Sequence, residues 1–125
     1  MPFTPGRPLA EAKADLFKAL AHPARVRVLE LLAEKEHTVG DLAAATGLEL
    51  SHLSQQVSVL RRAGVVDSRR VGSNVICTLR DPDTAELLAV ARRLLTHNLR
   101  QDQALLAALD GADDAVALAA RQDRA

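Results

Sequence analysis

The sequence predicts a mainly α-helical domain that carries one β-hairpin, with its elements in the order α–α–α–α–β–β–α. Three observations support this fold class. Apolar residues recur at helical spacing before Gly64, short β-branched segments occupy 65–79, and helical spacing returns after them. Hydrophobic residues make up 48% of the 125 residues but aromatic residues only 2%, so the core must consist largely of Leu, Val and Ala from packed helices.

Two helices are predicted near the N-terminus. Residues 1–8 contain three Pro and one Gly, so they are expected to form a flexible arm. Apolar residues at helical spacing predict a first helix over about 9–21, and a proline suits the first turn of a second helix over Pro23–Glu34. His22 lies between them, where a local structural hydrogen bond is favoured over a metal-binding role.

A third and a fourth helix follow a polar loop that includes His37. The third helix, about Val39 to Ala45, has Thr38 as its N-cap and Asp41 in its first turn. The connection GLE leads into the fourth helix, for which Ser51 is the expected N-cap. Three residues is the usual length of the turn in a helix-turn-helix motif, so the sequence predicts that motif here.

The period of the sequence changes after Gly64. The segments VVDSRRV and NVICTL are short and rich in β-branched residues, which is typical of strands. The residues between them predict a β-hairpin with Gly72, Ser73 and Asn74 in its turn. A helix-turn-helix followed by such a hairpin is a winged helix-turn-helix.

A long last helix is predicted over about 83–110, with Asp81 or Asp83 as its cap and a break at Gly111. Its leucines occupy more than one side, which favours burial against a second chain. Residues 111–125 are expected to be a frayed helix or disordered, so the domain itself spans 9–110.

The fourth helix has a polar face built mostly from uncharged residues. Leu53, Val57 and Leu60 form its buried stripe. In a helix-turn-helix the second helix enters the major groove, where Ser and Gln can hydrogen-bond to bases and Arg can contact the flanking phosphates. A merely solvated face is the alternative, and Ser51 could serve only as a cap. The DNA-binding residues predicted on this helix are Ser51, His52, Ser54, Gln55, Ser58, Arg61 and Arg62.

The hairpin region is basic, although the formal net charge of the protein is zero. Residues 61–80 contain five Arg and one Asp, a local charge of about +4. A glycine-containing tip can approach a nucleic-acid backbone closely. A soluble edge hairpin without a binding role is the alternative. The predicted DNA-binding residues of this wing are Arg69, Arg70, Gly72, Ser73 and Asn74.

Two segments resemble the ArsR-type (ArsR/SmtB) winged helix-turn-helix repressors of bacteria. They are LFKALAHPARVRVLELL at 16–32 and VGDLAAATGLELSHLSQQVSVLRRAGVVDSRRVGSNVICTL at 39–79. The resemblance implies a homodimer on a palindromic double-stranded DNA operator. It implies that the first and last helices form the dimer interface, which includes Leu9, Leu16, Leu88, Leu95 and Leu99. It also implies that Gln56 reads DNA, although the helical wheel places Gln56 toward the flank of the fourth helix.

The chain departs from this family in its sensing residues. Many members hold a metal through cysteines in a pattern like CVCDL, whereas this chain has TVGDL, with Thr38 and Gly40 in place of the ligands. Others use a set of Asp, His and Glu ligands on the last helix, which here has only His97, with Asp102 and Glu86 as the nearest carboxylates. No metal and no cofactor are therefore predicted.

Cys77 is the single cysteine and a candidate thiol sensor. It falls on the second strand of the hairpin, where a half-buried structural role is the favoured alternative. Arg80, the nearest cation in sequence, would lie on the opposite face of that strand.

These observations predict a sequence-specific regulator of transcription, most simply a homodimeric repressor with an unknown inducer. No signal peptide or membrane span is recognised, so a cytoplasmic location is expected. Enzyme activity is not expected, since no nucleophile elbow or Gly-rich phosphate loop is present. The alternatives are a metal- or thiol-responsive repressor with a non-standard site, and a helical protein-interaction module that has lost DNA binding.

Overall fold

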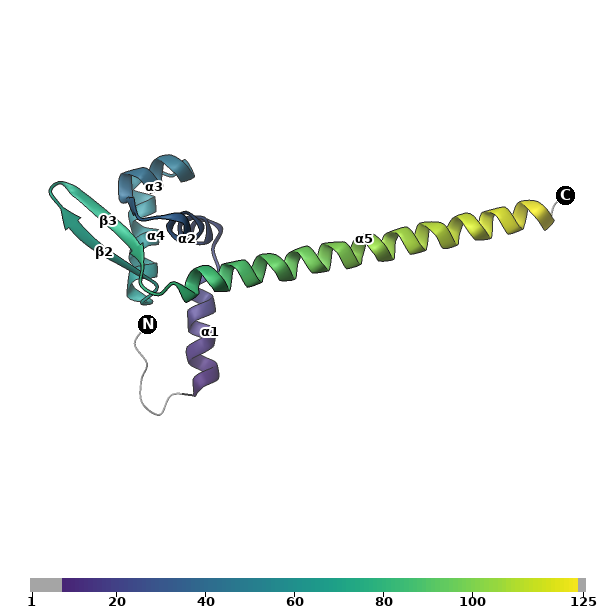
Figure 1. Ribbon diagram of the computed structural model, residues 1–125, viewed down its shortest axis with the longest axis horizontal. Coiled ribbons are helices and arrows are strands. Elements are labelled where there is room, and N and C mark those ends of the chain that lie inside the picture. The colour runs from purple at the N-terminus through teal and green to yellow at the C-terminus, as the bar shows by residue number, and fades with distance from the viewer. Residues whose placement is uncertain (1–7, 124–125) are drawn as a thin grey trace. The chain divides into compact units, whose positions relative to one another are not determined.

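The computed structural model describes the backbone of residues 8–123 and the side chains of residues 8–111. The described part is ordered α1–α2–β1–α3–α4–β2–β3–α5 (Figure 1). The chain divides into two compact units, one ending at Leu88 and one beginning at Ala89. The predicted flexible arm covers residues 1–8, and residues 1–7 of it lie outside the described residues.

The first four helices begin and end within two residues of their predicted positions. Local signals explain this agreement, because helical spacing and end residues are properties of neighbouring positions in sequence. The observed bounds are Leu9–Leu20 for α1, Pro23–Glu34 for α2, Val39–Thr46 for α3 and Leu50–Arg62 for α4.

Side chains cap two of these helices. The hydroxyl of Thr38 accepts the N–H of Asp41 at 3.0 Å and the Asp41 carboxylate accepts the N–H of Thr38, which forms a capping box at the start of α3. The Nδ1 atom of His22 accepts the N–H of Ala24 at 3.1 Å at the start of α2. The predicted cap at Thr38 and the predicted local hydrogen bond of His22 are both confirmed.

The start of α4 differs from the prediction. Gly47 ends α3 in the left-handed region at φ 73°, and α4 begins at Leu50 with Glu49 as its N-cap. Among the described residues, no side chain forms a capping hydrogen bond at the start of α4. The prediction that Ser51 is the N-cap is therefore wrong, because α4 begins two residues earlier than a cap at Ser51 requires. Ser51 lies inside the first turn instead and is exposed.

The sheet has three antiparallel strands in the order β1–β3–β2. Strands β2, Val66–Val71, and β3, Asn74–Leu79, form the predicted hairpin. Its turn contains two residues, because Asn74 pairs with Val71 as the first residue of β3. Gly72 has φ 60° at the first central position of the turn, where only glycine adopts such a value without strain. Asn74 is therefore a strand residue beside the turn and not part of it.

Strand β1, His37–Thr38, was not predicted. The sequence placed His37 in a loop, but His37 pairs with Cys77 and Thr38 pairs with Ile76. Two residues carry no recognisable strand pattern, so only the distant partner strand reveals this element.

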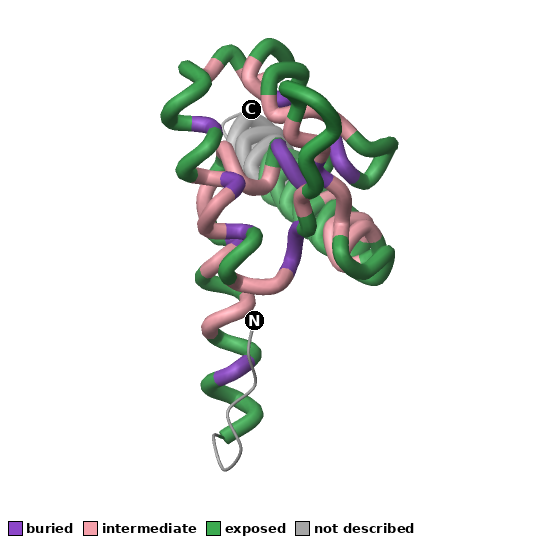
Figure 2. Tube along the Cα trace, turned by 90° about the vertical axis from the view of Figure 1, so that its left-hand side faces the viewer, coloured by how far each residue is buried: buried purple, intermediate pink, exposed green. Residues whose placement is uncertain are grey.

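One hydrophobic core joins α2, α3, α4 and the sheet. In Figure 2 buried positions are interspersed with intermediate and exposed ones along the helices that form this core, as expected for helices packed by one face. Leu53, Val57 and Leu60 anchor α4 in this core, as predicted. The opposite face of α4 is therefore left for other partners. The fully buried side chains are Val28, Leu29, Leu42, Leu53, Leu60, Val66 and Cys77.

Helix α5 spans Asp83–Asp123. Asp81 caps it, because its carboxylate accepts the N–H of Asp83 at 2.9 Å. The predicted break at Gly111 is wrong, since the helix continues through this glycine. A single glycine costs only about 1 kcal/mol relative to alanine in a helix, which helix-forming neighbours on both sides can offset. The predicted tail, 111–125, is accordingly helical as far as it is described.

The five residues predicted at a dimer interface fall into two groups. Leu16 and Leu88 are partly buried and pack against the core of their own chain. Leu9, Leu95 and Leu99 are 59 to 63% exposed. Only the second group leaves most of its surface exposed.

Candidate nucleic-acid interface

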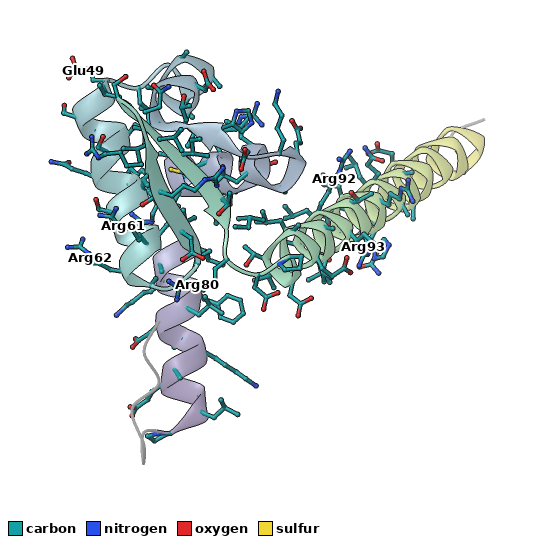
Figure 3. The ribbon with its side chains drawn as sticks, turned by 60° about the vertical axis from the view of Figure 1, so that its left-hand side comes forward. Glu49, Arg61, Arg62, Arg80, Arg92 and Arg93 are labelled. Carbon is teal, nitrogen blue, oxygen red and sulfur yellow. The ribbon has the colours of Figure 1, made fainter. Side chains whose placement is uncertain are left out.

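The exposed face of α4 carries most of the residues predicted to read DNA. Ser54 and Gln55 are exposed near its start, as are Ser51 and His52, while Ser58 is half-buried. Figure 3 shows Glu49 at the N-terminal end of α4 and Arg61 and Arg62 near its C-terminal end. Because no side chain caps the first turn, its N–H groups are available to an anion such as a phosphate.

Gln56 lies on the flank of α4 and is engaged within the chain. The Nη1 group of Arg25, on α2, donates to Oε1 of Gln56 at 2.9 Å. The same guanidinium donates to the carbonyl oxygens of Ala19 at 2.6 Å and Lys18 at 3.4 Å, near the end of α1. Gln56 therefore helps to hold α4 against α1 and α2. Sequence reasoning missed this contact because the two partners are 31 residues apart.

Arg61 connects α4 to the hairpin. Its Nη1 group donates to the hydroxyl of Ser68 on β2 at 2.9 Å. A guanidinium has five N–H donors, so this bond leaves others that can reach an anion. Arg61 thus fixes the hairpin to the helix while its charge remains exposed.

An open groove lies between α4 and the hairpin and has a volume of about 530 Å³. The beginning of α3 completes its wall. Six of the residues predicted to bind DNA line this groove, three from α4 and three from the hairpin. The sequence predicted the helix and the wing but not the groove between them. The six are Ser54, Ser58, Arg61, Arg70, Ser73 and Asn74.

The arginines of the hairpin region differ in how much charge they leave free. Arg69 forms an ion pair with Glu36 at 3.1 Å, and Arg80 pairs with Asp67 at 2.9 Å. Within the described residues, Arg62 and Arg70 have no such partner. The local charge predicted from the sequence was counted over residues 61–80 and so did not include Glu36. The unpredicted strand β1 follows Glu36 directly and pairs with β3, which places Glu36 beside the wing.

Cys77 is fully buried on β3, where the sequence favoured only half-burial. Burial raises the pKa of its thiol above the ordinary value, and the nearby charge of Arg61 opposes this increase only in part. The cation that influences the thiol is therefore Arg61 and not Arg80. A buried thiol with a raised pKa holds little of the thiolate form that reacts with oxidants.

The sequence departures at TVGDL can be followed in the structure. The Thr38 hydroxyl is used in the capping box, and Gly40 has no ligating side chain. Among the described residues, no group of three or more His, Cys, Asp or Glu side chains is placed to hold a metal ion. The buried Nε2 atom of His37 has no hydrogen-bond partner within the described part of the chain. In the same part of the chain, no helix is both long enough and apolar enough to cross a membrane.

A recognition helix anchored by one face, a basic hairpin beside it and a groove between them define a winged helix-turn-helix domain of the DNA-binding class. Residues 22–68 match the profile of a family described as bacterial regulatory protein, arsR family. An uncharacterized HTH-type transcriptional regulator of Mycobacterium tuberculosis, Rv0081, is 55% identical over 100 residues, which cover 79% of this chain and 88% of the relative. The chain belongs to the ArsR family of bacterial transcriptional regulators, and the predicted family and fold class are confirmed.

Solved structures agree with this assignment. The crystal structure of Rv0081 matches with a TM-score of 0.71 and covers 77% of this chain and 97% of that one. The homodimeric winged helix-turn-helix DNA-binding domain of Mb0332 from Mycobacterium bovis matches with a TM-score of 0.69 at 30% identity, covering 78% of this chain and 95% of that one. A biofilm growth-associated repressor of Agrobacterium fabrum is 43% identical over 75 residues, which cover 60% of this chain and 64% of the repressor.

Proposed function

We propose that this regulator is a homodimeric repressor that binds a palindromic double-stranded DNA operator through α4 and the wing. The observation that carries the proposal is the groove between them, which gathers serine, asparagine and arginine side chains from both elements. Uncharged donors and acceptors beside cations are what a DNA-binding surface needs, because bases are read by hydrogen bonds and phosphates by charge.

Within this proposal the residues divide by task. Ser54 and Gln55 are exposed on the leading half of α4 and would contact base edges in the major groove. Arg62 and Arg70, which have no ion-pair partner among the described residues, would contact phosphates on either side of the groove. Gln56 and Arg61 would act mainly by positioning α4, since both hydrogen-bond to other elements of the chain.

A homodimer would present two α4 helices to the two halves of the operator. Half-sites about one helical turn apart, or a multiple of it, would match the two-fold symmetry. Repression would follow when the bound dimer excludes polymerase from a promoter. The homodimeric Mb0332 domain and the named repressor of Agrobacterium fabrum support this choice. The protein would act in the bacterial cytoplasm, where its target DNA lies, without enzyme activity and without a bound metal or cofactor.

Genome-wide footprinting followed by fluorescence anisotropy on the recovered sites tests the proposal. We expect two chains per operator, a preference of about a thousandfold or more over random duplex, and affinity that falls steeply with salt. Equal affinity for operator and random DNA would rule out sequence-specific regulation. Failure to bind any duplex would favour the protein-interaction module instead.

A further inference from the structure

Leu50 is an exposed apolar residue within the largely polar surface that is proposed to read DNA. It is the first residue of α4 and follows Glu49, which Figure 3 labels at the N-terminal end of this helix. Its side chain is 58% exposed, and it lines the groove between α4 and the hairpin together with Ser54. Among residues 23–79, all of which are described, Val71 is the only other large apolar residue that is exposed. Val71 lies beside the hairpin turn and does not line the groove.

The core of the domain does not account for Leu50. Leu50 and Val57 are two turns apart on the same side of α4, since seven residues correspond to about 700° of rotation. Val57 is 4% exposed, whereas Leu50 is not among the residues that pack against the core. The apolar contact that commonly closes the start of a helix is provided by Leu48, which precedes the N-cap and packs against the core that contains Leu53. The side chain of Leu50 is therefore left for an external partner.

The position of Leu50 limits what it can contact on DNA. The N-terminal residues of a recognition helix lead into the major groove, where base edges are exposed. Leucine has no hydrogen-bond donor or acceptor, and the apolar group that the major groove presents is the C5-methyl group of thymine. Burial of leucine against a phosphate or a polar base edge would leave those groups without hydrogen bonds, which is costly. The C5-methyl group is therefore the chemistry that Leu50 can recognise.

The spacing between Leu50 and Ser54 indicates where this methyl group would lie. Ser54 follows Leu50 by four residues, so the two side chains are about 6 Å apart along α4 and within about 40° of each other around it. Successive base pairs are about 3.4 Å apart along the DNA axis. The thymine would thus lie about one or two base pairs from the base that Ser54 contacts.

We propose that Leu50 is a specificity-determining residue, which contacts the C5-methyl group of one thymine in each half of the operator. The inference rests on the proposed binding of α4 to operator DNA, and it adds an apolar contact to the hydrogen bonds proposed for Ser54 and Gln55. A 5-methylcytosine presents the same methyl group beside the amino donor of cytosine instead of the O4 acceptor of thymine. Thymine is the source proposed here, because every A·T pair carries the methyl group without modification.

Deoxyuridine substitution in the operator tests this contact, because deoxyuridine differs from thymidine only by lacking the C5-methyl group. Each thymine of one half-site found by footprinting would be replaced in turn, and the affinity of the full chain would be measured by fluorescence anisotropy. For the wild type we expect the dissociation constant to increase by about fourfold at one position, as for the loss of one buried methyl group, and to change little at the others. Replacement of the equivalent thymine in both half-sites should increase it by about fifteenfold.

Three variants test whether Leu50 makes this contact. Leu50→Ala should bind the deoxyuridine operator and the unmodified operator with nearly equal affinity, because the shortened side chain does not reach the methyl group. Leu50→Met keeps a long apolar side chain and should retain most of the wild-type preference. Val71→Ala removes an exposed apolar side chain from the wing and, as the matched control, should retain all of it. These substitutions remove no charge, so the dependence of affinity on salt should stay as in the wild type.

The outcomes separate this inference from the proposed function. A wild-type chain that binds no duplex in preference to random DNA would contradict the proposed function. Specific binding that changes by less than about twofold for deoxyuridine at every thymine would contradict only the methyl contact. An undiminished deoxyuridine effect in Leu50→Ala would overturn the role of Leu50. A preference that appears only when a cytosine is replaced by 5-methylcytosine would overturn thymine as the source of the methyl group.

Discussion

The unit that ends at Leu88 and the α5 segment that follows it use leucine in opposite ways. In the first unit Leu29, Leu42 and Leu53 are fully buried among the helices and the sheet. In the second, Leu95 and Leu99 are more than 60% exposed. The first unit thus completes its own core, whereas the described leucines of the second unit, from Leu94 to Leu109, would gain burial by association with another molecule. A leucine substitution should therefore affect folding in the first unit and association in the second.

The largest effect is expected from Leu60→Ala. Leu60 is fully buried, so removing its side chain should lower the free energy of unfolding by about 2–5 kcal/mol. The matched variant Leu106→Ala, at an exposed position of α5, should weaken self-association and leave the stability of the dilute monomer nearly unchanged. Urea unfolding at several protein concentrations separates these outcomes. A similar loss of monomer stability from both variants would break the comparison.

The next effect concerns what the exposed face of α4 reads. Gln55→Ala should weaken operator binding by about 1–3 kcal/mol, because a bidentate contact to a base is lost. Binding to random duplex should change little. Anisotropy titrations on both DNAs check this expectation, and an equal loss on both would remove Gln55 from base reading.

A somewhat smaller effect should distinguish Gln56 from its neighbour Gln55. Gln56 bonds to Arg25, so Gln56→Ala should lower the stability of the domain, which Gln55→Ala should not. A double-mutant cycle with Arg25→Ala and Gln56→Ala should give a coupling energy of about 1–2 kcal/mol in the free energy of unfolding. Additive effects of the two substitutions would show that this hydrogen bond contributes nothing.

The wing arginines should differ in their response to salt. Arg70 has no ion-pair partner among the described residues, so Arg70→Ala should flatten the plot of log affinity against log salt by about one unit. Arg69 already pairs with Glu36, and Arg69→Ala should flatten it less. Titrations at four salt concentrations give the slopes. An unchanged slope for Arg70→Ala would exclude its phosphate contact.

The smallest effect is expected at Cys77. Burial raises the pKa of this thiol above its ordinary value of 9.0. Below that pH both the folded and the unfolded chain keep the proton, whereas above it the unfolded thiol ionises first, so stability should fall as the pH increases. Urea unfolding at about pH 8 and about pH 10 should show a smaller decrease for Cys77→Ala than for the wild type. An equal decrease would contradict a raised pKa.

The sequence was most informative where structure depends on neighbouring residues. The capping box at Thr38, the proline at the start of α2 and the two strands of the hairpin are all local patterns, and the structure has each of them. The stripe of Leu53, Val57 and Leu60 likewise follows from helical spacing, and it determines which face of α4 is exposed.

Features that depend on distant partners were missed. Strand β1 exists because His37 pairs with Cys77, and no pattern within two residues could indicate it. The bonds of Arg25 to Gln56 and of Arg61 to Ser68 each join separate elements. The predicted break of α5 at Gly111 was wrong for a different reason. The free-energy cost of one glycine was overestimated relative to the helix-forming tendency of the residues around it. The sequence therefore predicted which elements form the candidate site, but not the contacts that its residues make with distant parts of the chain.

Arg25 links two helices with a single side chain. Its donors bond to carbonyl oxygens at the end of α1 and to the amide oxygen of Gln56 on α4, so a tilt of either helix relative to the other would break at least one of these hydrogen bonds. The orientation of α4 is in this way thermodynamically linked to the orientation of α1. The coupling free energy is reciprocal, so a partner that favours one orientation of α1 would change DNA affinity at α4 by the same factor by which DNA would change the affinity of that partner.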